Sequence, residues 1–194
     1  MLDFCIIGTG ISGSTIAKLL NRKFNVNVYD KAKGVGGRSS FKRLKGKIGF
    51  DHGLQYLSPR SLKFKRFTKE LVKKKILKHW DGKHKFLNES IKKKNKHVKL
   101  IGVKGNNDIS KYQLKKIKFF LQYELLKIKR FNKLWYLKFK NGHVVTSKNL
   151  ILSIPFPQCK KLLSKFVKTN LFKKKIIMNS CLTVLLVINR TSNS

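Results

Sequence analysis

The sequence predicts an α/β fold, and two features near its amino terminus carry that prediction. The apolar run Phe4–Ile7 ends in a Gly-x-Gly-x-x-Gly pattern over residues 8–13, and a helical pattern follows over Ser14–Lys23. A second apolar, β-rich run, Val26–Tyr29, is closed by Asp30. The order strand, glycine turn, helix, strand and acid is typical of a domain that binds a dinucleotide.

Each part of the pattern has a separate physical role in such a domain. Gly8 allows a tight turn, Gly10 leaves no side chain where the backbone approaches a pyrophosphate, and Gly13 lets the helix pack against the strand. The helix amino terminus presents free N–H groups and its positive dipole end to the phosphates. Asp30 lies where it can accept hydrogen bonds from a ribose. A strand–turn–helix without a ligand is the alternative, but the acid at this spacing favours a dinucleotide site.

The charge of the chain is extreme. Its 194 residues hold 46 lysines and arginines against 8 acids, a net charge of +38. A basic face for nucleic acid or anionic lipid is one interpretation. The other is a general compositional bias toward lysine. We favour the second, with non-specific polyanion binding as a side effect, because the lysines run through the whole chain and adjoin no recognised nucleic-acid motif.

Neither a membrane span nor a signal peptide is predicted. The longest apolar run, Leu182–Ile188, is shorter than a membrane span and suits a buried strand. The first apolar run is the first strand, preceded by only three residues. Cys5, Cys159 and Cys181 lack metal-ligand spacing, so we expect buried thiols in a reducing, cytoplasmic compartment and no metal site.

Two further segments suggest contact with a ligand. Glycines within residues 31–38 make a loop whose backbone can lie against a ligand, and Arg38 offers a fork of donors suited to phosphate. Residues 48–57 suggest a strand that turns at Gly53 into a close-approach loop. His52 has no catalytic partner nearby in the sequence, which favours a structural role. A helical pattern then covers Ser61–Lys75.

These segments carry a resemblance to a known family. Asp30-Lys31-Ala32 with Gly36-Gly37-Arg38, followed by residues 51–56 (Asp-His-Gly-Leu-Gln-Tyr), resembles the renalase-like branch of the FAD-dependent amine-oxidase superfamily. The resemblance implies a Rossmann-type FAD-binding domain with an inserted α+β substrate domain. It implies that FAD is the cofactor and that the flavin carries the chemistry, so the chain's catalytic residues stay unknown. The implied cofactor-binding residues are Gly8, Gly10, Ile11, Ser12, Gly13, Asp30, Lys31, Gly37, Arg38, Gln55 and Tyr56.

Among these residues the resemblance assigns Ser12 and Arg38 to the pyrophosphate and Asp30 to the adenosine ribose. Gln55 and Tyr56 would lie near the flavin. Residues 1–75 would form the first segment of the FAD domain and 76–100 the start of the substrate domain. Residues 101–155 would return to the FAD domain with a β-meander, and 156–194 would form a truncated, incomplete part of the substrate domain.

The middle of the chain predicts short elements. Ile76–Trp80 and Lys83–Leu87 are expected as strands around an Asp81-Gly82 turn, followed by a lysine-rich loop to residue 99. Residues 101–106 resemble the family's Val-Gly-x-Pro-Gly-Met segment, with Lys104 at the proline and Asn106 at the methionine. Asp108 is expected to cap a helix that runs to about Leu121.

The last third predicts mostly strands. Tyr123–Ile128, Leu134–Lys140 and His143–Ser147 are expected as antiparallel strands, with a type I′ turn at Asn141-Gly142. Leu150–Ile154 is expected as a separate buried strand. Pro155-Phe156-Pro157-Gln158 resembles the family's Pro-x-Pro-Gln, and Leu162-Leu163 lie on the helix that follows. Cys181–Ile188 is expected as a strand of the substrate domain.

Three functions are open at this point. The first is an FAD-dependent oxidoreductase that takes hydride from a small-molecule substrate, such as an amine or a dihydronicotinamide. The second is a truncated, inactive nucleotide-binding fragment, or a chain completed by a second chain. The third is a basic protein that binds nucleic acid or a membrane surface.

Overall fold

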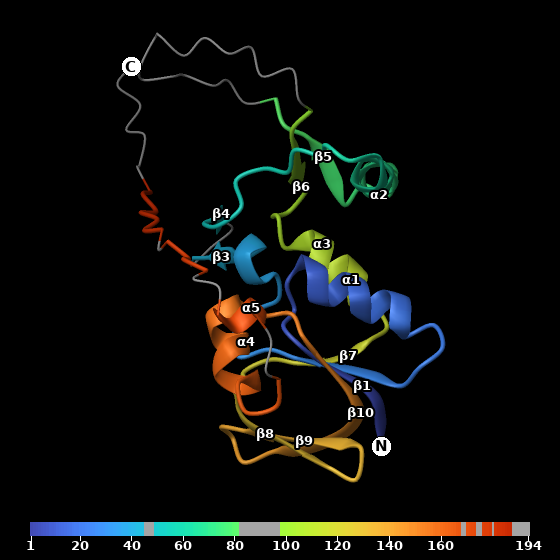
Figure 1. Cartoon of the computed structure of the whole chain (residues 1–194). Helices are drawn as coiled ribbons and strands as arrows, with labels where there is room; N and C mark the ends of the chain where they lie inside the picture. The colour runs from blue at the N-terminus through green and yellow to red at the C-terminus, as the bar shows by residue number, and fades with distance from the viewer. Residues whose placement is uncertain (45–48, 82–97, 168–169, 174–175, 180, 188–194) are drawn as a thin grey trace, which may run out of the picture.

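The computed structural model describes residues 1–44, 49–81, 98–167, 170–173, 176–179 and 181–187. Its main sheet has six strands in the order β7-β2-β1-β10-β9-β8 (Figure 1). These strands are β1 (Leu2–Ile7), β2 (Val26–Tyr29), β7 (Lys118–Phe120), β8 (Leu125–Phe131), β9 (Leu134–Phe139) and β10 (Val144–Leu152).

One half of this sheet is parallel. β1 pairs in parallel with β2 on one side and with the end of β10 on the other, and β7 pairs in parallel with β2. The β1–β2 connection runs through α1 (Ile11–Leu20), which confirms the predicted strand–helix–strand unit. The predicted α/β class is therefore correct. Helix α1 begins and ends three residues before the predicted range Ser14–Lys23.

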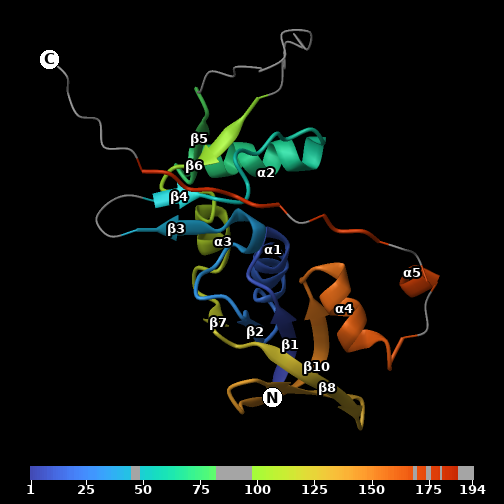
Figure 2. The same ribbon diagram turned by 90° about the vertical axis from the view of Figure 1, so that its left-hand side faces the viewer.

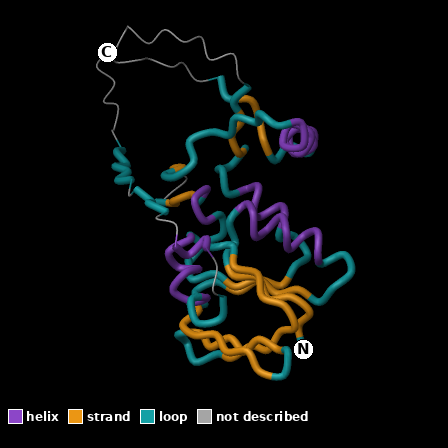
Figure 3. The backbone as a smooth tube through the Cα atoms, in the orientation of Figure 1, coloured by secondary structure: helices purple, strands orange, loops and turns teal. Residues whose placement is uncertain are grey.

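Helices α1 and α3 (Asp108–Gln113) cover one face of the parallel strands, as Figure 3 shows in purple above the orange sheet. Ile6 and Val28 point to this face and pack with Ala17 of α1 and Leu114 after α3. Because alternate residues of a strand face opposite sides, Cys5 and Tyr29 point to the other face.

The prediction of a helix from Asp108 to about Leu121 was wrong. The helix ends at Gln113, and residues 118–120 form β7, whose Phe119 is in register with Val28. Leu114 and Ile117 have helical spacing, but both enter the core beneath α1 from a turn, in which Lys116 has a φ of +67°. Pairing with the free edge of β2 outweighs the local helical pattern here.

The antiparallel half contains a second correction. The expected strands His143–Ser147 and Leu150–Ile154 are one strand, β10, which pairs antiparallel with β9 at its start and parallel with β1 at its end. The predicted strand Tyr123–Ile128 corresponds to β8, whose bounds are displaced to 125–131. One continuous strand thus joins the meander to the parallel sheet.

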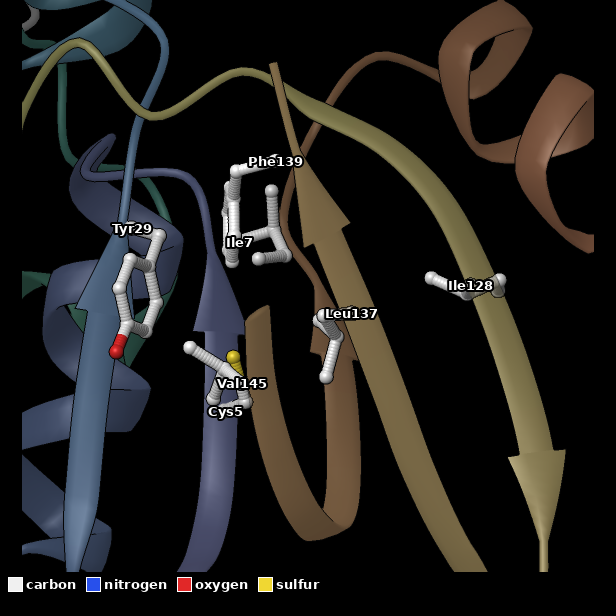
Figure 4. Close-up of a cluster of buried hydrophobic side chains, with 7 residues drawn as sticks. All are labelled: Cys5, Ile7, Tyr29, Ile128, Leu137, Phe139 and Val145. Carbon is white, nitrogen blue, oxygen red and sulfur yellow. The ribbon is translucent and has the colours of Figure 1, made fainter. Parts of the chain in front are cut away.

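The meander curls over the parallel strands and closes a second core. Figure 4 shows Cys5, Ile7 and Tyr29 facing side chains from the meander: Ile128, Leu137, Phe139 and Val145. Tyr29 packs against Phe139 with ring centroids 4.8 Å apart, and Leu137 and Phe139 are fully buried. This aromatic-rich core fixes the end of β2, and so the position of Asp30.

The predicted type I′ turn was placed at the wrong hairpin. Such a turn needs positive φ at both central residues, and between β9 and β10 only Gly142 has one, at +83°. Between β8 and β9, Asn132 and Lys133 have φ values of +47° and +61°, and Phe131 is in register with Leu134. The two-residue turn with positive φ is therefore this one, which carries no glycine.

Smaller elements form a layer at the carboxyl edge of the parallel strands (Figure 1). They comprise η1 (Gly37–Ser39), the ribbon β3 (Phe41–Arg43) and β4 (Gly49–Asp51), α2 (Leu62–Lys73) and the ribbon β5 (Leu77–His79) and β6 (Leu100–Gly102). The predicted helix over 61–75 and the strand over 76–80 are confirmed, although β5 pairs with β6. The expected strand Lys83–Leu87, Gly82 of its turn and most of the following loop lie outside the described residues.

The chain continues past β10 into α4 (Phe156–Leu163), which confirms the helix after Pro155, and then α5 (Asn170–Lys173). The predicted strand Cys181–Ile188 is wrong for residues 181–187, which are extended but not in a sheet, while Ile188 is outside the described residues. These residues pass beside β4, where Thr183 Oγ1 donates to the carbonyl of His52 at 3.0 Å (Figure 2). Leu182 is 96% exposed, so none of the described elements covers it.

The thiols also differ from expectation. Cys5 is buried, but Cys159 is only half-buried and Cys181 is exposed, and all three are free. Burial was expected for all of them; Cys181 lies on the uncovered extended segment.

Candidate functional site

The turn between β1 and α1 is built on close backbone packing. Gly8 has a φ of +111°, a conformation that side chains disfavour, and a Cβ there would lie 2.4 Å from the carbonyl oxygen of Ser153. A Cβ on Gly13 would lie 2.1 Å from the carbonyl oxygen of Gly8. The tight turn at Gly8 and the close helix–strand packing at Gly13 are therefore confirmed.

The glycine loop that follows β2 lies directly against this turn. Gly36 and Gly10 form a parallel bridge, and the Gly36 N–H donates to the carbonyl of Thr9 at 3.2 Å. A Cβ on Gly37 would lie 3.2 Å from the Gly10 Cα. Around Gly10 itself there is room, because its ideal Cβ would meet nothing nearer than 3.8 Å. Two glycine segments thus meet at the amino terminus of α1, with a space next to the backbone.

Asp30 lies at the junction of these segments, and the residue is 9% exposed. One oxygen accepts from the backbone N–H of Thr9 at 2.7 Å and from its hydroxyl at 2.6 Å. The other accepts from the N–H of Ala32 at 2.9 Å. The acid therefore holds the glycine turn and its own loop in place. The sequence showed its spacing but not this bonding to Thr9.

Lys31, the next predicted site residue, faces the meander side. It lines a cleft of about 300 Å³ at the end of β2. The other lining residues are Lys33, Gln122, Glu124, Lys140 and Asn141. Three lysines thus border this cleft, and one of them, Lys31, directly follows Asp30 in the sequence.

Three further residues predicted to bind the cofactor are near the turn. Ile11 begins α1 and packs against the core under α2, whereas Ser12 is exposed in the first turn of α1. Arg38 is exposed on η1. Its backbone carbonyl accepts from the N–H of Leu54 at 2.9 Å, and a Cβ on Gly53 would lie 2.2 Å from that oxygen. The close approach predicted at Gly53 is confirmed as contact with Arg38.

Asn106 has a structural role that its place in the sequence does not reveal. It is fully buried, and its Nδ2 donates to the carbonyls of Leu54 at 2.6 Å and Gln55 at 3.2 Å. Its Oδ1 accepts from the N–H of Gly102 at 2.9 Å, and its own N–H donates to Asp51 Oδ1 at 2.8 Å. The asparagine therefore joins the 51–55 loop to the end of β6. Burial raises the pKa of the Asp51 carboxyl, and the bond from Asn106 opposes that rise.

Gln55 and Tyr56 follow on the same loop but face different surroundings. The Gln55 side chain is exposed. The Tyr56 ring stacks on Trp80 with centroids 5.3 Å apart, and the Lys99 ammonium lies 4.8 Å from the Tyr56 centroid. The structure brings the glycines, Asp30 and Arg38 together, whereas the Tyr56 ring packs on Trp80, the residue after β5.

Catalytic groups are sparse in the described part of the chain. No three His, Cys, Asp or Glu side chains gather there as a metal site. His52 Nε2 lies 3.1 Å from Ser40 Oγ, which gives the histidine a structural partner. Among the described helices none is long and apolar enough to cross a membrane.

Comparison with known proteins supports the Rossmann-like fold. Residues 6–71 match the family model described as an NAD(P)-binding Rossmann-like domain. A search of curated proteins gave no match. Among solved structures, a protein named as a protoporphyrinogen oxidase of Exiguobacterium sp. 255-15 matches with a TM-score of 0.59 at 13% identity. A putrescine oxidase double mutant from a redesign of cofactor binding matches with a TM-score of 0.62 at 14% identity.

A third solved structure, the tetracycline destructase Tet(51), matches with a TM-score of 0.57 at 15% identity. The matches cover 83%, 83% and 87% of this chain, but 61%, 60% and 42% of those proteins in the same order. The chain thus spans about three fifths of the first two. At these identities the likeness concerns the fold, and the chain has a Rossmann-like dinucleotide-binding fold that is shared with these enzymes.

Proposed function

We propose that this chain binds FAD and forms the nucleotide-binding part of an FAD-dependent oxidoreductase of the renalase-like, amine-oxidase type. The observation that carries the proposal is the contact of Gly36 and Gly37 with Gly10, beside Asp30. A second glycine segment behind the ribose acid distinguishes FAD-type from NAD-type use of the first motif in the family that the sequence resembles. The similarity to a putrescine oxidase supports the same class.

The residues present fit such a cofactor. Gly10 has no side chain and its ideal Cβ would meet nothing nearer than 3.8 Å, so a pyrophosphate would approach the backbone at the amino terminus of α1, where N–H groups and the helix dipole favour anions. Ser12 and Arg38 would add a hydroxyl and a guanidinium there, and Asp30 would accept from the ribose hydroxyls. Lys31 would flank the adenosine end.

The flavin, when bound, supplies the hydride-accepting chemistry. The chain's own contribution is to orient the cofactor and to shape its surroundings. Asn106 would do so indirectly, because it fixes the backbone of Leu54 and Gln55, the loop expected to approach the flavin. The proposed substrate is a small organic molecule with a hydride-donating C–H bond, such as an amine or a dihydronicotinamide.

Reconstitution of the purified chain with FAD tests this function. After removal of free flavin, we expect a yellow protein whose bound flavin is bleached anaerobically by a member of an amine and dihydronicotinamide panel. Gly10→Val should abolish flavin retention, because a branched side chain would fill the space beside the turn, while the far-UV circular dichroism stays unchanged. Retention of flavin by this variant would contradict the assigned site.

A second candidate is a nucleotide-binding chain without turnover, or one that needs a second chain to complete it. The observation that favours it is the exposed apolar segment near the carboxyl end, with Leu182 96%, Val184 79% and Leu186 71% exposed. Flavin that is bound but never reduced by any substrate of the panel would select this candidate. Exposed apolar chain also predicts self-association, measurable by light scattering.

A further inference from the structure

The outward face of the β-meander carries a regular array of side chains that the nucleotide site does not use. The core residues Ile128, Leu137 and Val145 point inward, so their neighbours in the strands point outward. Strand register groups these outward residues in three rows: Lys127, Lys138 and Val144; Lys129, Tyr136 and Thr146; Phe131 and Leu134. We call these eight residues the meander face.

The meander face is strongly positive. Lys127, Lys129 and Lys138 are exposed, and none of them has a carboxylate partner within the described ranges. Lys148, further along β10 and outside the rows, is paired, because its ammonium bonds Asp3 at 2.8 Å. The rows themselves contain no acid. The face is therefore complementary to a polyanion.

One pair of lysines on the meander face destabilises the sheet of the isolated protein. Lys127 is directly opposite Lys138 in the β8–β9 register, and like charges in such pairs destabilise a sheet. A bound anion between the two ammonium groups would remove that repulsion.

Aromatic rings lie among the lysines. Tyr136 occupies the middle of the central row, half-buried, between Lys129 and Thr146. Phe131 is 65% exposed in the next row. Neither ring has an aromatic partner among the described residues. Rings that are open on one side and surrounded by cations suit stacking with an unpaired base whose phosphates meet the lysines.

We propose that the meander face binds single-stranded nucleic acid, with Tyr136 as the stacking platform and Lys127, Lys129 and Lys138 as phosphate contacts. An anionic membrane fits the face less well. Its exposed apolar side chains are Phe131 on β8 and Val144 on β10. They are on opposite sides of β9 and in different rows, so they form no continuous patch to enter lipid. The proposal does not depend on the proposed flavin function.

The test measures the affinity of the full chain for a fluorescent 15-nucleotide oligothymidine by anisotropy, as a function of salt. The face variant replaces Lys127, Lys129 and Lys138 with glutamine. The matched control replaces Lys63, Lys65 and Lys69, three exposed lysines of α2, in the same way. Both variants lose the same net charge, so a diffuse electrostatic field predicts equal losses.

We expect the face variant to bind at least about tenfold more weakly at moderate salt, with the slope of log affinity against log salt reduced by about 2. The α2 control should stay within about threefold of the parent. Equal losses in the two variants would overturn the proposal and leave lysine bias as the explanation. Urea unfolding of both variants confirms that they are folded.

Tyr136 separates stacking from charge. Tyr136→Leu keeps every charge and should weaken oligothymidine binding by on the order of tenfold, whereas Tyr136→Phe should bind like the parent. Unchanged binding by Tyr136→Leu would overturn the stacking role. Vesicles of phosphatidylserine are the competing ligand: if they, but not the oligonucleotide, lose affinity in the face variant, the surface binds lipid and the proposal is wrong.

Discussion

Thr9 and Asp30 are joined by two hydrogen bonds, 2.7 Å from the backbone N–H and 2.6 Å from the hydroxyl, although 21 residues separate them in the chain. Thr9 is fully buried and lies inside the glycine pattern. The acid at the end of β2 therefore fixes the conformation of the turn that would meet a pyrophosphate. The carboxylate that we propose for ribose binding is thus also the one that holds the turn.

Thr9→Val should destabilise the fold by about 1–3 kcal/mol, because it removes a bond to a buried charge without changing side-chain volume. The matched control is Thr15→Val. Its hydroxyl bonds only the carbonyl of Ile11 within α1, so a loss below about 1 kcal/mol is expected. Urea unfolding measures the free energy of unfolding of both variants. Equal losses would show that the Thr9–Asp30 bond stabilises the fold no more than the bond within α1.

Asn106→Met tests the hydrogen bonds by which Asn106 joins the 51–55 loop to the end of β6. The variant restores the residue of the family segment that the sequence resembles, yet we expect a loss of about 2–4 kcal/mol. The reason is that it leaves the Gly102 N–H and the Leu54 carbonyl without the partners they have here. Thermal unfolding gives the measurement, with Asn141→Met at an exposed turn as control. A variant as stable as the parent would show that the loops hold without Asn106.

The sequence predicted the strand–turn–helix–strand unit, Asp30 and the helix over 61–75, because each is encoded in local periodicity and glycine spacing. It failed where long-range pairing decides. Residues 118–120 became a strand through pairing with β2, and β10 is continuous because two different strands pair with its two ends. The hydrogen bonds of Asn106 to the backbone of Leu54 and Gln55 could not be predicted from local sequence, because these partners are about fifty residues away.

Arg38→Ala should weaken FAD binding more than Lys42→Ala, although each removes one positive charge. Both side chains are exposed, Arg38 beside the glycine turn and Lys42 on β3. A guanidinium placed on the phosphates predicts an excess loss of about 1–3 kcal/mol for Arg38. Flavin fluorescence titration at moderate salt measures both, and equal losses would favour a diffuse basic field.

The three cysteines should react in a fixed order. Cys181 is exposed and should be alkylated first by a maleimide, followed by Cys159 and, only after unfolding, Cys5. Burial raises the pKa of the Cys5 thiol to about 12, so the native protein keeps this proton while the unfolded chain loses it near pH 8.5. Stability should therefore fall as pH rises above that value, and Cys5→Ala should reduce the fall. Rapid labelling of Cys5 in the native protein would contradict the closed core of Figure 4.

The most direct test of the account is the identity of the nucleotide that the chain retains. The protein is incubated with equal FAD and NAD, freed of unbound ligand, denatured, and the released nucleotide is identified by chromatography and mass spectrometry. The contact of Gly36 and Gly37 with the Gly10 turn predicts FAD in the supernatant and none from Gly10→Val. Retention of NAD without flavin, or of neither nucleotide by the folded parent chain, would contradict the account.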